Sequence, residues 1–211
     1  MLILGLTGSI GMGKTTAAAD FRRLGVPVHD ADAAVHELMG AGGGAVAAVG
    51  AAFPGTEAGG AIDRAKLGAM VFGAPQELKR LETILHPMVG DHKRRFLKAG
   101  ARRREAVVVM DVPLLFETGG ETACDAVVTV SAPPFVQAAR VLTRPGMTRE
   151  RLAQILAQQT PDLEKRRRSD FVVPTGLGRL ESLRTIRKIL AEVSTWPARH
   201  WPPWAVGRHG S

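Results

Sequence analysis

Residues 8–15 read Gly-Ser-Ile-Gly-Met-Gly-Lys-Thr and fit the pattern G-x-x-x-x-G-K-[ST] at every fixed position. An apolar run, Leu2 to Leu6, precedes the glycines, and a helical pattern follows from Thr15. In this context the backbone can curl so that its N–H groups and the helix N-terminus face a phosphate. Lys14 is expected to reach the β- and γ-phosphates, and the Thr15 hydroxyl to bind Mg²⁺. The alternative is a glycine-rich turn that binds nothing. The motif in this context favours a nucleoside triphosphate site over that alternative.

Strand and helix patterns alternate along the rest of the chain, which predicts an α/β fold with a parallel sheet covered on both faces. Residues 33–100 are expected to be mostly helical, with Pro87 ending one helix or beginning another. Thr148 is a predicted N-cap, and Leu180 to Val193 the last strong helix. Further short apolar runs predict buried strands at Val26–His29, Val107–Asp111, Ala126–Val130 and Phe171–Val173.

The 211 residues include one cysteine, Cys124, which excludes an internal disulfide and a cysteine-based zinc cage. No targeting segment is expected, because the apolar start Met1–Leu4 is short and runs into glycines. The longest uncharged stretch, Leu38 to Phe53, is too rich in glycine and alanine to span a membrane. These features predict a soluble, cytoplasmic protein with no membrane partner.

The formal net charge is +8, and much of the positive charge is clustered. Residues 91–104 carry seven basic side chains against one acid, and Lys165–Arg168 form a second cluster. Aromatic residues are 5% of the chain and tyrosine is absent, so stacking surfaces for single-stranded nucleic acid are scarce. Solvated helix faces and a site for a small polyanion are favoured over specific nucleic-acid binding.

Three aspartates follow predicted strands, at the sheet edge where α/β proteins bind ligands. Asp32 is the candidate that orients an acceptor hydroxyl and takes its proton, while Asp30 and Asp32 could both instead cap a helix. Asp111 is placed to help hold Mg²⁺, or to cap the turn into Pro113.

Arginines gather later in the chain. Arg140 and Arg144 share a helix face, which suits charge on transferring phosphoryl oxygens. Arg149 and Arg151 are expected to belong to a solvated face, and Pro145-Gly146 could be the hinge of a lid. The chain contains no asparagine, so it lacks the N-K-x-D motif that reads guanine.

The sequence resembles the dephospho-CoA kinase family over roughly residues 2–190. Six segments carry this resemblance: L-T-G-S-I-G-M-G-K-T-T (6–16), D-A-D (30–32), L-H-P (85–87), D-V-P-L-L-F-E (111–117), R-V-L-T-R (140–144) with M-T-R-E (147–150), and S-D-F-V-V (169–173). The resemblance implies transfer of phosphate from ATP, with Mg²⁺, to the ribose 3′-hydroxyl of dephospho-CoA. It also implies a five-stranded P-loop core at 1–32 and 101–194, a lid at about 140–158 and an acceptor-binding insertion at 33–100.

The same resemblance implies roles for individual residues. Asp32 would act on the 3′-hydroxyl, while Lys14 and Arg140 would stabilise the transferring group. The residues implied to contact ATP are Gly11, Met12, Gly13, Lys14, Thr15, Thr16 and Arg144. Those implied to contact the acceptor are Asp32, His86, Pro87, Leu114, Leu115 and Glu117. From the residues alone, His86 is as well explained by a structural role before a proline. The metal would be held by Thr15 and Asp111.

Two segments depart from the family pattern. Val173-Pro174-Thr175-Gly176 stands where the family has asparagine and glycine, so the expected adenine-side contact needs another partner. Residues 195–211, rich in Trp and Pro, match nothing in the family and are expected to form an extended tail. The protein could be a monomer or form a small homo-oligomer. A kinase of another small acceptor and a nucleic-acid-binding P-loop protein remain the alternative functions.

Overall fold

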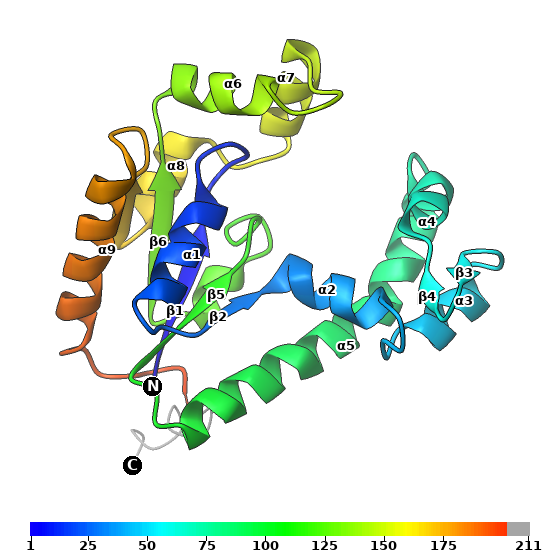
Figure 1. Cartoon of the computed structure of the whole chain (residues 1–211), viewed down its shortest axis with the longest axis horizontal. Coiled ribbons are helices and arrows are strands. Elements are labelled where there is room, and N and C mark those ends of the chain that lie inside the picture. The colour runs from blue at the N-terminus through cyan, green and yellow to red at the C-terminus, as the bar shows by residue number, and fades with distance from the viewer. Residues whose placement is uncertain (202–211) are drawn as a thin grey trace. The chain divides into compact units, whose positions relative to one another are not determined.

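The computed structural model describes residues 1–201, and these residues form two compact units (Figure 1). The first unit joins residues 1–29 to the chain from residue 100 onward. The second unit consists of residues 30–99. Within the described residues, no helix is both long enough and apolar enough to cross a membrane.

A five-stranded sheet forms the centre of the first unit, in the order β2-β5-β1-β6-β7 (Figure 1). Strand β1 is parallel to both of its neighbours, and Leu4 lies opposite Val109 on one side and Ala126 on the other. The predicted α/β fold with a parallel sheet is confirmed. The strands are β1 (Leu2–Thr7), β2 (Val28–Asp30), β5 (Val107–Asp111), β6 (Ala126–Ser131) and β7 (Phe171–Pro174).

Alternate residues of β1 face opposite sides of the sheet, as the period of a strand requires. Leu2, Leu4 and Leu6 belong to a buried cluster that contains side chains from α1 (Lys14–Arg23) and α9 (Arg179–Val193). On the other face a Cβ at Gly5 would lie 2.7 Å from Leu115 Cδ2. A larger residue at position 5 would have to displace this side-chain end, and both faces of the central strand are covered.

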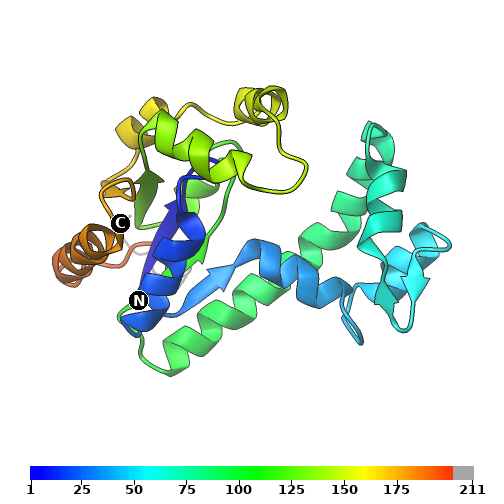
Figure 2. The same cartoon turned by 45° about the horizontal axis from the view of Figure 1, so that its top comes forward.

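Four further helices complete the first unit. Figure 2 shows α6 and α7 beyond the carboxyl end of the sheet, on the side to which the P-loop also projects. Thr148 is the predicted N-cap of α7, and its hydroxyl accepts a hydrogen bond from Arg151 N at 3.2 Å. Two short helices that the sequence patterns did not predict are the 3-10 helix Gly120–Ala123 and α8. The α-helices are α6 (Pro134–Leu142), α7 (Arg149–Ala157) and α8 (Asp162–Arg168).

The second unit is mostly helical, as predicted, with one small hairpin. Gly59 and Gly60 form the hairpin turn with φ values of 59° and 75°, a conformation that glycine adopts without strain. Leu38, Phe53, Leu81 and Leu85 are among the residues of its separate buried cluster. Its elements are α2 (Ala31–Met39), α3 (Val46–Ala52), β3 (Glu57–Ala58), β4 (Ala61–Ile62), α4 (Arg64–Val71) and α5 (Pro75–Arg102), the last of which continues past residue 99.

Helix α5 runs without interruption through Pro87, so the predicted helix boundary at that residue is wrong. A proline inside a helix removes one backbone hydrogen bond and crowds the preceding turn. Pro87 is exposed, whereas Leu81, Leu85 and Met88 pack into the cluster on both sides of it. The continuous apolar stripe keeps the helix intact, and the proline lies on the solvent side, where a helix bends most easily.

The start of the predicted tail is packed against the first unit, although it has no regular secondary structure. The Trp196 ring lies 5.6 Å from the Phe171 ring, measured between centroids. Asp125 Oδ1 accepts hydrogen bonds from the backbone N–H groups of Arg199 and His200 at 2.6 and 3.2 Å. Residues 195–201 are therefore anchored to the first unit; the rest of the predicted tail, 202–211, lies outside the described residues.

Candidate functional site: a phosphate-binding loop and its arginine clamp

The glycine-rich motif forms the turn between β1 and α1, and we call residues 8–15 the P-loop. Gly11 and Gly13 have φ values of 76° and 92°, in the left-handed region that favours glycine. A Cβ at Gly11 would lie only 2.5 Å from Val141 Cγ2 of α6. Helix α1 begins at Lys14, directly after the turn, so its free N–H groups face the space enclosed by the loop. The backbone therefore has the form that the motif predicts.

Lys14, at the start of α1, forms an ion pair with Asp111, at the carboxyl end of β5. Lys14 Nζ lies 2.6 Å from Asp111 Oδ1, and the Asp111 side chain is only 2% exposed. The pair places one ammonium group and one carboxylate beside the start of α1. The sequence left two roles open for Asp111, help in holding Mg²⁺ or capping of the turn into Pro113. The structure places its carboxylate beside the P-loop lysine.

Thr15 and Thr16 occupy the first turn of α1 and are exposed. A threonine hydroxyl and a carboxylate are both hard oxygen ligands of the kind that Mg²⁺ binds. No group of three or more His, Cys, Asp or Glu side chains among residues 1–201 could hold a metal by itself. Thr15 and Asp111 therefore fit a metal that takes its other ligands from phosphate and water.

Arg140 reaches from α6 to the P-loop and to the end of β7. Its Nη2 donates to the Thr175 carbonyl at 2.6 Å, and its Nη1 donates to Thr175 Oγ1 at 3.1 Å and to the Gly11 carbonyl at 3.4 Å. Thr175 Oγ1 in turn donates to the Met12 carbonyl at 2.5 Å. The guanidinium is thereby fixed beside the phosphate loop. Thr175 thus has an internal role at the position where the family pattern has asparagine.

Two glutamines that sequence reasoning missed hold the outer part of the same loop. Gln137 Nε2 donates to the Ile10 carbonyl at 2.7 Å, and Gln159 Oε1 accepts from Ile10 N at 3.1 Å. The backbone carbonyl and N–H of Ile10 are thus bonded to side chains from α6 and from the residues that follow α7. The helix pattern of α6 places Gln137 one turn before Arg140, but nothing in the sequence marks Gln159.

The remaining predicted arginines lie away from these contacts. Arg144 and Arg149 are exposed, at the end of α6 and the start of α7. Arg151 donates to the Gly146 carbonyl at 3.3 Å and so closes the turn between the two helices. Gly146 has a φ of 69°, which marks this turn as a sharp bend. Contact of Arg144 with ATP stays a prediction.

The segment after β5 has a mainly internal set of contacts. Leu115 is buried with Phe116 and Val127, whereas Leu114 is 41% exposed. Glu117 Oε1 lies 2.9 Å from Lys165 Nζ and accepts from Thr160 N at 2.7 Å. These contacts give Leu115 and Glu117 roles in the fold, and their contact with an acceptor stays a prediction.

Lys165 departs from the expectation of a solvated basic cluster at 165–168. Its side chain is fully buried and its charge is paired with Glu117. Arg168 pairs with Glu121 and Glu164, and its guanidinium lies 4.5 Å from the Phe116 ring centroid. Arg166 and Arg167 of this cluster are exposed and have no described partner among residues 1–201, so half of the cluster stabilises the fold.

The other predicted acceptor residues, Asp32, His86 and Pro87, belong to the second unit, together with Asp30. Asp30 is the N-cap of α2, and its carboxylate accepts from Ala33 N at 3.0 Å, which is the structural role considered for it. Asp32 lies in the first turn of α2 and is exposed. His86 and Pro87 lie on the exposed side of α5. Asp32 is therefore the strand-end aspartate whose carboxylate is presented to solvent.

The P-loop, the lysine and the arginine clamp all lie in the region that matches a known family. The sequence model described as dephospho-CoA kinase matches residues 2–177. This chain belongs to the dephospho-CoA kinase family. The match contains every residue to which a catalytic or binding role was assigned, from Gly11 to Arg144.

Individual members of the dephospho-CoA kinase family match over most of their length. Dephospho-CoA kinase of Paramagnetospirillum magneticum is 65% identical over 166 residues, which cover 79% of this chain and 78% of the relative. Dephospho-CoA kinase of Rhodospirillum rubrum is 59% identical over 190 residues, covering 88% and 89%. The crystal structure of TT1252 from Thermus thermophilus aligns with a TM-score of 0.75 at 37% identity, over 91% of this chain and 97% of that one. Dephospho-CoA kinase from Campylobacter jejuni, at 20% identity and a TM-score of 0.63, shares the fold over 92% and 98%.

Replacing Glu117 by Gln is expected to lower the free energy of unfolding by about 3 kcal/mol at pH 7, because it leaves the buried Lys165 ammonium unpaired. Burial raises the pKa of Glu117, but the Lys165 ion pair and the Thr160 N–H together lower it below its ordinary value of 4.5. A lowered folded-state pKa stabilises the protein above pH 4.5, and this stabilisation is lost as the pH falls through the folded value.

Urea denaturation at pH 7 and near pH 4 tests this expectation, and the difference between wild type and Glu117→Gln should shrink at the lower pH. Glu164→Gln is the matched control, because Glu164 is 53% exposed and its pair with Arg168 spans 3.4 Å. Its expected effect is below about 1 kcal/mol. A difference for Glu117→Gln that is equally large at both pH values would contradict the ionic origin of the effect.

Gln159→Leu is expected to weaken binding of a non-hydrolysable ATP analogue by about three- to tenfold. The substitution removes one hydrogen bond, worth about 1 kcal/mol, from Ile10 and loosens the loop that must hold the phosphates. Isothermal titration calorimetry measures the affinity. Gln158→Leu, at the exposed neighbouring position, should bind as tightly as the wild type. Equal affinity in both variants would show that the Gln159 contact does not hold the P-loop.

Proposed function

We propose that this chain transfers the γ-phosphoryl group of ATP to the ribose 3′-hydroxyl of dephospho-CoA, which yields coenzyme A and ADP. The observation that carries the proposal is the P-loop with its two fixed cations, Lys14 and Arg140, in a member of the dephospho-CoA kinase family. The cytoplasm, where ATP is made and used, is the compartment that the proposal implies.

The P-loop residues position the donor. Backbone N–H groups of Gly11 to Thr15 bind the phosphates, and the N-terminus of α1 adds its partial positive charge. Lys14 exchanges its ion pair with Asp111 for the β- and γ-phosphates. Arg140, held in place by Thr175, faces the negative charge that spreads over the equatorial oxygens during transfer.

Thr15 and Asp111 are the residues that would hold Mg²⁺ beside these phosphates. The metal, when bound, neutralises charge on the β- and γ-oxygens. Asp111 is buried at the end of β5, so its carboxylate is in place when Lys14 turns to the phosphates.

Asp32 prepares the acceptor. Its carboxylate accepts a hydrogen bond from the 3′-hydroxyl and takes the proton as the oxygen attacks the γ-phosphorus. The bond between the γ-phosphorus and its bridging oxygen breaks, and ADP leaves. Exposure of Asp32 in the first turn of α2 is what allows it to meet a substrate.

Product analysis tests the proposed reaction. We expect Mg-ATP and dephospho-CoA together to release ADP and to give a product whose mass and fragmentation place a new phosphate on the ribose 3′-oxygen. Adenosine monophosphate and shikimate serve as comparison acceptors under the same conditions. Faster phosphorylation of either compound, or nucleotide binding without any stimulation by dephospho-CoA, would overturn the assignment.

Asp32→Asn is expected to lower kcat by roughly 10²–10⁴ while ATP affinity stays within a few fold of wild type, because the amide cannot accept the proton. The matched control is Asp30→Asn, since asparagine also caps helices well and Asp30 acts as the cap of α2. Steady-state kinetics and calorimetry with an ATP analogue measure the two effects. Near-normal kcat in Asp32→Asn would refute the proposed role.

A further inference from the structure

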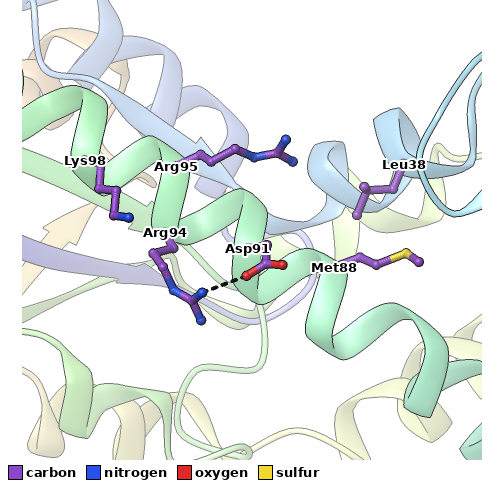
Figure 3. Close-up of a pocket in the computed structure, with 7 residues that line it drawn as sticks. Leu38, Met88, Asp91, Arg94, Arg95 and Lys98 are labelled. Atoms are coloured by element: carbon purple, nitrogen blue, oxygen red, sulfur yellow. Dashed lines mark hydrogen bonds and ion pairs between the residues drawn. The ribbon is translucent and has the colours of Figure 1, made fainter.

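Figure 3 shows a pocket of about 360 Å³ that lies within the second unit and is lined mainly by residues of α5. Acceptor binding is the role that the sequence assigns to this unit, so the pocket belongs to a role already considered. The first unit contains a charged pair to which neither the sequence nor the proposed mechanism gives a role. It joins Asp20 of α1 to Arg179, the first residue of α9.

Asp20 is a carboxylate buried in the middle of the helix that continues from the P-loop. Its side chain is fully buried. Arg179 Nη2 and Nε donate to Asp20 Oδ1 at 3.1 and 3.4 Å, and Arg23 Nη1 is farther from the same oxygen, at 3.8 Å. Within residues 1–201, Asp20 Oδ2 is buried and accepts no hydrogen bond. Because a buried carboxylate is stable only when its charge is paired, Asp20 holds Arg179 close to α1.

Arg179 directly follows a short segment, residues 175–178, that reads Thr-Gly-Leu-Gly and connects β7 to α9. Gly178 has a φ of 97°, and Leu177 is 74% exposed, so neither side chain fixes the backbone here. A glycine loses more conformational freedom on ordering than any other residue. The segment therefore depends on contacts at its two ends.

Ser182 joins the segment to the helix that follows it. Its hydroxyl donates to the Pro174 carbonyl at 2.8 Å and lies 3.3 Å from the Gly178 carbonyl. The Asp20–Arg179 pair then joins the start of this helix, α9, to α1. The end of the segment is thus tied first to α9 and, through α9, to the helix that carries the P-loop lysine.

Thr175 completes the connection at the P-loop. Its hydroxyl donates to the Met12 carbonyl at 2.5 Å, and its own carbonyl accepts from Arg140 Nη2 at 2.6 Å. The P-loop, α1, α9 and the segment 175–178 therefore form a closed ring of contacts, and Arg140 is bonded to this ring. A shift of α9 away from α1 would move Thr175 and, with it, the Arg140 guanidinium.

We propose that Asp20 and Arg179 are positioning residues for phosphoryl transfer. Their pair keeps the segment 175–178 in register with the P-loop and, through Thr175, keeps Arg140 aimed at the transferring group. The proposal rests on the proposed function, which gives Arg140 its role. A displacement of about 1 Å in such a group can lower a rate by about 10²-fold. An interaction made mainly in the transition state is lost from kcat rather than from KM.

The kinetic test compares Arg179→Gln with the wild type, with Arg179→Lys and with Arg184→Gln. Arg184→Gln is the matched control, because Arg184 is also on α9, is 63% exposed and pairs with Glu181 at 3.7 Å. We expect Arg179→Gln to lower kcat about tenfold and to change the KM for dephospho-CoA less than about twofold. Arg179→Lys keeps the positive charge and should restore most of kcat. Arg184→Gln should behave as the wild type.

Amide hydrogen exchange measured by mass spectrometry gives a readout that does not need activity. In Arg179→Gln, exchange should become faster in peptides that cover 174–182 and the P-loop, while the strand Val107–Asp111 stays protected. A purely structural role would instead raise exchange throughout the unit and leave the kcat of the folded protein unchanged. In a Thr175→Val background, Arg179→Gln should lower kcat less than about twofold further, because the pair acts through Thr175.

Arg179→Gln leaves Asp20 buried without its main cation, and the variant could fail to fold for that reason. The double variant Asp20→Asn/Arg179→Gln removes both charges and then takes its place, with the same loss of kcat expected, since the charge-assisted bond is gone. A wild-type kcat in the folded variant, an equal loss in Arg184→Gln, or fully additive effects with Thr175→Val would overturn the proposal. Failure of the wild type to phosphorylate dephospho-CoA would instead refute the proposed function, and the exchange data would still show whether the pair orders the segment.

Discussion

The turn from Gly8 to Thr15 keeps its shape because later segments of the chain bind its outward-facing peptide groups. Gln137 and Gln159 bond to the two sides of Ile10, Arg140 to Gly11, and Thr175 to Met12. A loop built on glycines pays a high conformational entropy, so it needs such partners to have one structure. With its outer carbonyls bonded, the N–H groups on the inner side remain for a phosphate.

The contacts of Glu117 extend this arrangement into the centre of the unit. Its carboxylate accepts a hydrogen bond from Thr160 N. The residue before Thr160, Gln159, accepts a hydrogen bond from Ile10 N. The same carboxylate neutralises Lys165 of α8, whose side chain is completely buried. The loop after β5, the start of α8 and the P-loop are thus connected through one charged group. Such a buried pair restricts the chain to one arrangement, because any alternative would leave an ammonium group buried without its partner.

Much of the fold could be predicted because local patterns and tertiary packing agree. The buried strands β5 and β6 read as apolar runs rich in β-branched residues, and the P-loop lysine and hydroxyl are specified by the spacing of the motif. Pro87 could not be placed correctly, since its effect on α5 is decided by packing on both sides of it. Lys165 reads as one of four consecutive cations, and only its partner Glu117, 48 positions earlier, makes it internal. Gln159 likewise acquires its contact from a residue 149 positions away.

A kinase whose donor and acceptor are both adenine nucleotides has to distinguish two similar ligands, and the P-loop favours one of them. The P-loop presents backbone N–H groups and a helix N-terminus, which suit the multiply charged terminal phosphates of a triphosphate. Dephospho-CoA lacks a terminal phosphate for the loop. Dephospho-CoA would therefore leave part of the P-loop unfilled, and selectivity for ATP at this loop follows from the difference between the two affinities.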